Sequence, residues 1–387
     1  MIKILCKWIG LTFMLVLAGC SNDEILTTSG NDSDAELSEG NLVEIVLDKG
    51  EVTRTPRPLL YPDISGNNVN VVKLKMTFSY GSGRDHHSYE LTNENVILKN
   101  NKGEVLDDFD EVNGEWTLTW TSSEGSLDWN ESHDDQMAIR IFGLENLEGL
   151  DKDPRQLEIQ AYGYHDTGSL PNGFSISGGV YSYSASSTSS ASSTSDEYTF
   201  LGDVDELFAG KHTVGLDNSG NFTETAQVVL TRQVAGLMVC LKEVPAGTEA
   251  IVLSLEGVAT GCEFPSDLEY NTNGTVTDAK IKFSIPDEMS NYIKDGVYDF
   301  EKYANDYPDM FPIVPSSLNW YGGNPHFDEP LLFASFFLFA SEQPTVKIND
   351  RNLKLKDGDT GFKRNHFYYI GTPENPASLR EIMGSGE

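Results

Sequence analysis

Residues 69–80 read VNVVKLKMTFSY, with apolar side chains at every second position from Val72 to Phe78. These side chains would share one face of an extended chain, and the residues between them, including Lys73 and Lys75, would share the other. Alternation with a period of two is typical of a β-strand buried on one side only. The stretch therefore predicts a sheet with one face against a hydrophobic core.

Similar stretches recur along the chain, separated by turn-forming residues. We expect further strands at residues 42–47, 116–120, 137–142, 157–164, 226–244, 251–255, 279–285, 331–339, 345–348 and 366–370. Residues 226–244 are too long for one flat strand and contain Gly236, which predicts a bulge or two consecutive strands. Only residues 286–294 have helical character. The pattern predicts an all-β chain of two β-sandwiches.

Turn signals and composition suggest how the chain is divided. The Gly/Asn/Asp cluster at residues 215–221 precedes the long apolar stretch, so we expect sandwiches at 55–218 and 219–387. The tract YSYSASSTSSASSTS at 181–195 cannot bury apolar area to offset its ordering entropy, which predicts a surface loop.

The N-terminus has the pattern of an export signal. Lys3 and Lys7 precede a short apolar run that is about half the ~20 residues a membrane-spanning helix needs. The run ends in Leu17-Ala18-Gly19-Cys20, which resembles the bacterial lipobox, where the signal is cut before the cysteine and the thiol is acylated. We expect residues 1–19 to be a lipoprotein signal peptide, Cys20 to carry the lipid, and residues 21–40 to be a tether.

Charge excludes several partners. The 387 residues hold 60 acidic and 27 basic side chains, a net charge of −33. Binding to nucleic acid needs a concentrated basic surface, and binding to an anionic membrane by charge alone also needs basic residues.

Motifs for chemistry are missing from the sequence. It has no GxSxG, HExxH, Walker loop, Rossmann fingerprint or CxxC, so we expect no enzyme, no cofactor and no metal. His86 and His87 are adjacent and would point to opposite faces of a strand. Residues 128–135 (DWNESHDD) do not have EF-hand spacing and favour a solvated acidic loop. Trp116 and Trp120 could stack on sugars, but we interpret them as core residues.

Two cysteines remain in the exported chain after Cys20. Disulfides can persist outside the cell, and a Cys240–Cys262 bridge could connect adjacent strands. The alternative is two free, buried thiols.

Several short motifs, in order, resemble the fimbrillin family of Bacteroidales, the subunits of type V pili. They are the lipobox, a first strand at 42–47, Thr53-Arg54-Thr55 just after it, Val229-Leu230-Thr231-Arg232-Gln233-Val234-Ala235, and the closing strand His366-Phe367-Tyr368-Tyr369-Ile370-Gly371. The resemblance implies two tandem transthyretin-like Greek-key β-sandwiches. It also implies assembly by strand exchange, in which a surface protease removes the first strand and a strand of another subunit replaces it.

The resemblance points to a processing site within the sequence. Arg57 precedes Pro58, which blocks trypsin-like enzymes, so Arg54–Thr55 is the expected scissile bond and residues 20–54 the tether with the removable first strand. An anchor subunit would instead stay uncut and lipidated. Residues 372–387 make a poor donor strand because they contain two prolines and two late glycines, which favours a tip or accessory subunit.

These expectations describe a lipoprotein on the surface of the outer membrane that moves into a fimbrium after processing and contributes to adhesion. Its partners would be other fimbrial subunits and a receptor, host or bacterial, that the sequence does not identify. The alternative from another class is a surface glycan-binding lipoprotein of a polysaccharide-uptake system.

Overall fold

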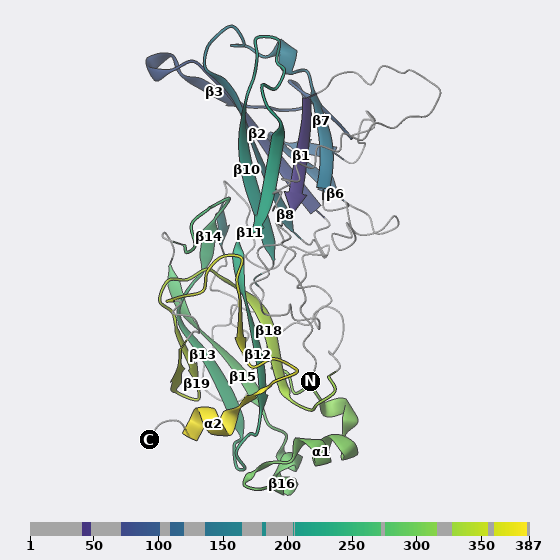
Figure 1. Ribbon diagram of the computed structural model, residues 1–387, viewed down its shortest axis with the longest axis vertical. Helices are drawn as coiled ribbons and strands as arrows, with labels where there is room; N and C mark the ends of the chain where they lie inside the picture. Colours follow the sequence, from purple (N-terminus) through teal and green to yellow (C-terminus); the bar gives the residue numbers. More distant parts are fainter. Residues whose placement is uncertain are drawn as a thin grey trace, which may run out of the picture. The chain divides into compact units, whose positions relative to one another are not determined.

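The computed structural model describes residues 41–47, 71–100, 109–119, 136–164, 180–182, 204, 206–271, 275–315, 327–354 and 360–384. Within these residues the chain is built mainly of strands, and the strands belong to two sandwiches that follow one another in sequence (Figure 1). The prediction of an all-β fold with two sandwiches is confirmed.

The first sandwich is a ten-stranded sheet, as counted over the described residues, that folds back on itself. Its strand order is β4 (Ile97–Asn100), β7 (Gln136–Phe142), β1 (Asn41–Leu47), β11 (Ala226–Arg232), β10 (Leu207–Gly215), β8 (Arg155–Tyr164), β2 (Val71–Tyr80), β6 (Glu115–Thr119) and β5 (Phe109–Val112), with β3 (His87–Glu90) beside β2.

The sheet folds where β10 meets β11, because these strands pair only at Phe208↔Arg232 and Ala209↔Thr231. Beyond that point Gly210 crosses close to β11. A Cβ there would lie 2.0 Å from the carbonyl oxygen of Val229, so only glycine fits. The two halves of the sheet therefore face each other across a core.

That core contains the alternating residues of the quoted stretch. Val72, Leu74, Met76 and Phe78 are all fully buried, and they pack in one cluster with the inward side chains of β1, β7, β8 and β11. The expected one-sided burial of residues 69–80 is confirmed over β2.

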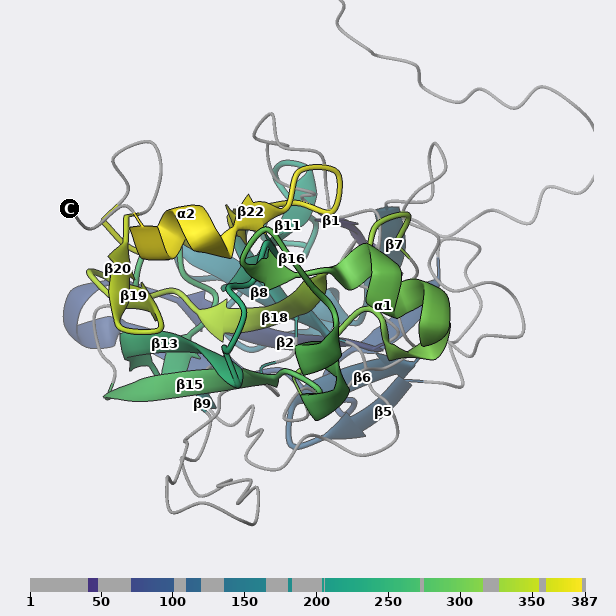
Figure 2. The same ribbon diagram turned by 90° about the horizontal axis from the view of Figure 1, so that it is seen from below.

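The second sandwich has two layers, visible in Figure 2 as β13 and β15 on one side and β18 on the other. One layer consists of β18 (Leu332–Phe339), β12 (Val234–Lys242), β21 (Phe367–Ile370) and β22 (Ala377–Ser378). The other consists of β15 (Val276–Ser284), β13 (Ala250–Ala259), β19 (Thr345–Ile348) and β20 (Arg351–Leu353). Two small ribbons are added: β9 (Val180–Ser182) with β14 (Gly261–Glu263), and β16 (Ile293–Lys294) with β17 (Val297–Tyr298).

β12 lacks an alternating pattern because it is covered on both faces. Leu237, Val239 and Leu241 pack in the main core of the second sandwich, whereas Met238 and Cys240 pack on the other face with Leu331 and Phe333. A strand buried on both faces reads as a continuous apolar run. Residues 226–244 are indeed two consecutive strands, and Gly236 lies inside β12 rather than at the break.

The break between β11 and β12 falls at Gln233, and it changes the expected division of the chain. We expected the second sandwich to begin at residue 219, but β11 pairs with β1 and β10 of the first sheet. The turn cluster at 215–221 instead connects β10 to β11 within that sheet. The second sandwich sheets begin with β12.

The break at Gln233 is lined by buried charged groups. Arg232 is 3% exposed; its Nε bonds to Glu206 at 2.6 Å, and its Nη1 donates to Oδ1 of Asn365. The guanidinium also lies over the rings of Phe208 and Phe367. The partners come from both sandwiches, so this arginine connects them where the chain crosses over.

Helices are few among the described residues, and the two α-helices found there lie where none was expected. Residues 286–294 form the 3-10 helix η4 (Asp287–Asn291) and the short strand β16, and the other 3-10 turns among the described residues are η1 (Gly83–Asp85), η3 (Leu144–Asn146) and η5 (Pro308–Met310). In α1 (Phe300–Asp306), Asp299 caps the first turn. In α2 (Leu379–Gly384), Leu379 is fully buried against the second core. No helix among the described residues is long and apolar enough to cross a membrane.

Replacing Arg232 by methionine should destabilise the protein by about 3–5 kcal/mol, because Glu206 would be left buried without its main cationic partner. Urea denaturation measures this loss, and Arg232→Met combined with Glu206→Met should recover part of it. Lys347→Ala is the matched control. The Lys347–Glu256 pair is 26% and 39% exposed, and its loss should cost less than about 1 kcal/mol. Equal losses for Arg232→Met and Lys347→Ala would contradict the structural importance of Arg232.

Candidate functional site

The candidate site is the strip of the first sheet that β1 fills, which we call the β1 groove. β1 is antiparallel to β7 on one side and parallel to β11 on the other (Figure 1). Val43 lies opposite Ile139 and Ala226, and Ile45 follows in the same register. Both neighbours are therefore hydrogen-bonded to β1, and without β1 each would present an unpaired edge.

The side chains of β1 alternate between the core and the outer surface. Val43 and Ile45 are fully buried in the first core, and Leu42, Glu44 and Val46 are half-buried. On the outer face, Nε2 of Gln227 donates to Oε2 of Glu44 at 3.2 Å. Full burial of two aliphatic side chains is worth roughly 3–6 kcal/mol, at about 1.5–3 each.

Asn41, the first residue of β1, is held by its side chain. Its Nδ2 donates to the carbonyl oxygen of Gly220 at 2.9 Å, and its Oδ1 accepts from the backbone N–H of Phe222 at 2.7 Å. We call this pair of bonds the Asn41 clasp. It joins the start of β1 to the loop at 215–223, between β10 and β11. The clasp therefore fixes the position of β1 along its own axis, in addition to the pairing with β7 and β11.

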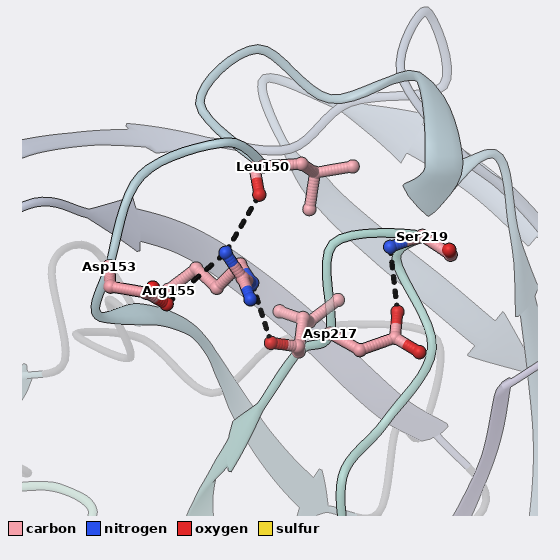
Figure 3. Close-up of polar contacts among 6 residues, drawn as sticks. Leu150, Asp153, Arg155, Asp217 and Ser219 are labelled. Atoms are coloured by element: carbon pink, nitrogen blue, oxygen red, sulfur yellow. Dashed lines mark hydrogen bonds and ion pairs between the residues drawn. The ribbon is translucent and has the colours of Figure 1, made fainter.

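The 215–223 loop is itself rigidly held. Oδ1 of Asp217 accepts from the N–H group of Ser219 at 2.8 Å (Figure 3). It also accepts from the N–H group of Asn221 at 2.8 Å. Arg155 Nε donates to the carbonyl of Leu216 at 2.8 Å and Nη1 to that of Leu150 (Figure 3). These bonds fix the backbone groups that the Asn41 clasp uses.

Gly220 brings the loop against the neighbouring 3-10 turn. Its φ of +81° is left-handed, and a Cβ there would lie 2.6 Å from the backbone nitrogen of Glu145. Only glycine satisfies both conditions. The carbonyl that accepts from Asn41 is thus held from the loop side and from η3.

The hydrogen bonds to Asp217 alter its acidity. The bonds from Asn221 hold the pKa of the Asp217 carboxyl below its ordinary value, and the bond from Ser219 and the charge of Arg155 act in the same direction. Asp217 therefore stays ionised to a lower pH than an ordinary aspartate.

The residues predicted for processing fall outside the described part of the chain: Cys20, Arg54 and Thr55. So do residues 128–135, Trp120 and all but the first two residues of the low-complexity tract. Trp116, the other candidate for stacking on a sugar, is 2% exposed in the first core. The structure thus brings the expected first strand into a defined groove but does not describe the arginine after it.

Cys240 and Cys262 are free, buried thiols and form no bridge. They belong to different apolar clusters, with Cys240 on the outer face of β12 and Cys262 in the main core of the second sandwich. Burial raises the pKa of both thiols to about 12, so both are protonated at neutral pH.

The Asn41 clasp was missed from the sequence. An asparagine at the start of an apolar stretch is an ordinary turn signal, and its partners lie 179 and 181 residues away. Nothing local in the sequence could have indicated them.

No protein-family model matches the chain, and no curated protein matches it. Solved structures with some similarity include the fimbrial anchor protein Mfa2 from Porphyromonas gingivalis, with 11% identity, a TM-score of 0.32 and 81% of each chain covered. A candidate cell adhesion protein from Bacteroides uniformis has 10% identity and a TM-score of 0.30, covering 86% of this chain and 91% of that one. A candidate adhesin from Bacteroides thetaiotaomicron has 9% identity and a TM-score of 0.32, covering 84% and 79%.

Ile45→Ala should destabilise the first sandwich by about 2–5 kcal/mol, because it leaves a cavity where β1 meets the core. Urea denaturation gives the free energy, and hydrogen exchange should show β7 and β11 opening together with β1. Glu44→Ala is the matched control on the outer face and should stay within about 0.5 kcal/mol of wild type. Equal effects of the two substitutions would mean that β1 is not part of the core.

The amide resonances of Ser219 and Asn221 should titrate with Asp217, at a midpoint below the ordinary aspartate pKa of about 3.9. Because the pKa is lowered in the folded state, the contribution of Asp217 to stability is full above the unfolded value and is lost as the pH falls through the folded value. An NMR titration measures the midpoint, and Asp217→Asn should remove the transition. A midpoint at or above 3.9 would contradict the hydrogen bonding described for this loop.

Proposed function

We propose that this chain is an exported lipoprotein subunit of a cell-surface fimbrium, a tip or accessory subunit that assembles by protease-triggered strand exchange and contributes to adhesion. The observation that carries the proposal is the position of β1. It lies in the middle of a sheet, between β7 and β11, and among the described residues it is joined to the next strand, β2, through residues 48–70. The sequence motifs that resemble the fimbrillin family support the same function.

Cleavage after Arg54 would change how β1 is held. While the chain is intact, β1 binds as part of the same molecule, at a high effective concentration. After cleavage it is a separate peptide, and holding it costs about 4–15 kcal/mol of translational and rotational freedom. The roughly 3–6 kcal/mol from Val43 and Ile45 does not clearly exceed that cost. A cut β1 can therefore leave, and a strand from another subunit can enter by pairing with both edges.

The placement of residues 377–384 favours a subunit that accepts a donor strand and does not provide one. Ala377 and Ser378 pair with β12, and Leu379 is fully buried where α2 begins. Residues 377–384 are thus part of the second sandwich and would have to unfold to act as a donor. A tip or accessory subunit has no need of a donor strand of its own.

The lipid on Cys20 would hold the precursor at the outer membrane until it is cut. In an uncut chain the same lipid would make a permanent anchor. The two roles differ in the N-terminal residue of the protein recovered from cells: Thr55 for a processed subunit, and acylated Cys20 for an anchor.

Arg54→Ala should abolish processing and assembly. Wild-type protein, mixed with a sister subunit and a protease that cuts after arginine but not lysine, should begin at Thr55 and form SDS-resistant oligomers, whereas the variant should remain monomeric; trypsin is unsuitable because it can also cut after Lys49. Arg57→Ala is the matched control and should behave as wild type, because Pro58 already protects that bond. The readouts are N-terminal sequencing and gel electrophoresis without boiling. A wild-type chain cut at Arg54 that stays monomeric would contradict the proposal.

A further inference from the structure

We propose that the β1 groove selects its occupant by a side-chain carboxamide, so that the strand replacing β1 must carry asparagine at the position of Asn41. The inference rests on the proposed function, because it concerns the strand that enters the groove when β1 leaves. It adds to that function the chemistry of the partner and the register in which the partner binds.

Asn41 occupies an inward-facing position at the start of β1. Residues 41, 43 and 45 alternate with the outward residues, so Asn41 belongs to the inward-facing set of Val43 and Ile45. It lies beside the 215–223 loop, whose Leu216 and Phe222 pack against the first core. An inward position that would otherwise be apolar is therefore occupied by a polar group with two hydrogen bonds.

The two bonds require a group that donates and accepts at the same time. The carbonyl of Gly220 needs a donor, and the N–H of Phe222 needs an acceptor. An asparagine side chain supplies both. Aspartate supplies only acceptors and would place a negative charge against the Gly220 carbonyl, whereas alanine or leucine would leave both backbone groups without these partners.

The loop cannot readily move to suit another side chain. Asp217 fixes its turn, Arg155 fixes its start, and Gly220 is packed against Glu145. The clasp therefore has a fixed position along the β1 groove. A strand shifted by two residues would keep its apolar face inward, but it would place the wrong side chain at the clasp. Backbone pairing alone does not prevent such a shift, and the carboxamide does.

The described geometry defines the occupant. It runs parallel to β11 and antiparallel to β7, and it carries asparagine followed by aliphatic residues two and four positions later. The C-terminal segment of this chain fits poorly. Asn375 is followed by Pro376, which lacks a backbone N–H, and the aliphatic residue four positions later, Leu379, is already buried. The occupant is thus a strand of a different subunit.

The test uses the full chain with a protease site inserted between residues 48 and 57, cut and freed of β1 in mild urea. A labelled peptide of residues 40–47 is then titrated into the emptied groove and followed by fluorescence anisotropy. Peptides with Asn41→Ala and Asn41→Asp should bind at least about tenfold more weakly. Glu44→Gln, the matched control on the outer face, should bind within about twofold of the parent peptide.

The possible results separate the two proposals. Parent and Asn41→Ala peptides that bind equally would overturn the carboxamide selection and leave strand exchange standing. If no peptide binds the emptied groove, the carboxamide selection is overturned, whereas strand exchange, in which a cut β1 leaves, is judged by the oligomer assay with a sister subunit. A second measurement does not need the groove emptied: in the uncut chain, Asn41→Ala should raise hydrogen exchange at Val43 and Ile45 about tenfold. An unchanged rate there would also overturn the inference.

Discussion

The first sandwich depends on β1 being present between β7 and β11. The strand supplies hydrogen-bonding partners to both neighbours and two fully buried side chains to the core. β7 and β11, which are separated by 83 residues in sequence, both pair with β1 in one sheet. In the proposed strand exchange, a strand from another subunit would take the place of β1 by pairing with both of these edges.

The same loop that connects β10 to β11 also receives the start of β1. Its tight turn around Asp217 and Gly220 serves the fold by joining two antiparallel strands, and serves the groove by presenting one carbonyl and one N–H to Asn41. Because these backbone groups are fixed by several independent contacts, they can recognise a side chain without rearranging. In the proposed exchange, the alternating apolar positions would tolerate many strands, and the contact at Asn41 would select among them.

The connection between the sandwiches is chemically different from either core. At Gln233 the chain leaves the first sheet and enters the second, and the surrounding polar groups are buried. Nη1 of Arg364 donates to Oε1 of Gln233 at 2.7 Å, beside the Arg232–Glu206 pair. Buried polar groups need their partners in defined places, so this network restricts how β12 continues from β11.

The sequence by itself determined the fold class and most of the strands. Alternation located β2, β7 and β8, the continuous apolar run located β12, and the lipobox predicted an exported chain, all from local patterns. Prediction from the sequence was wrong where contacts between residues distant in the sequence determine the structure. The turn at 215–221 is a strong local signal, but only the pairing of β11 with β1 showed to which sheet the next strand belongs. Likewise α2 is short and depends on burial of Leu379. The groove and its clasp are purely tertiary, because Asn41 gains its partners only when residues 179 and 181 positions away are folded beside it.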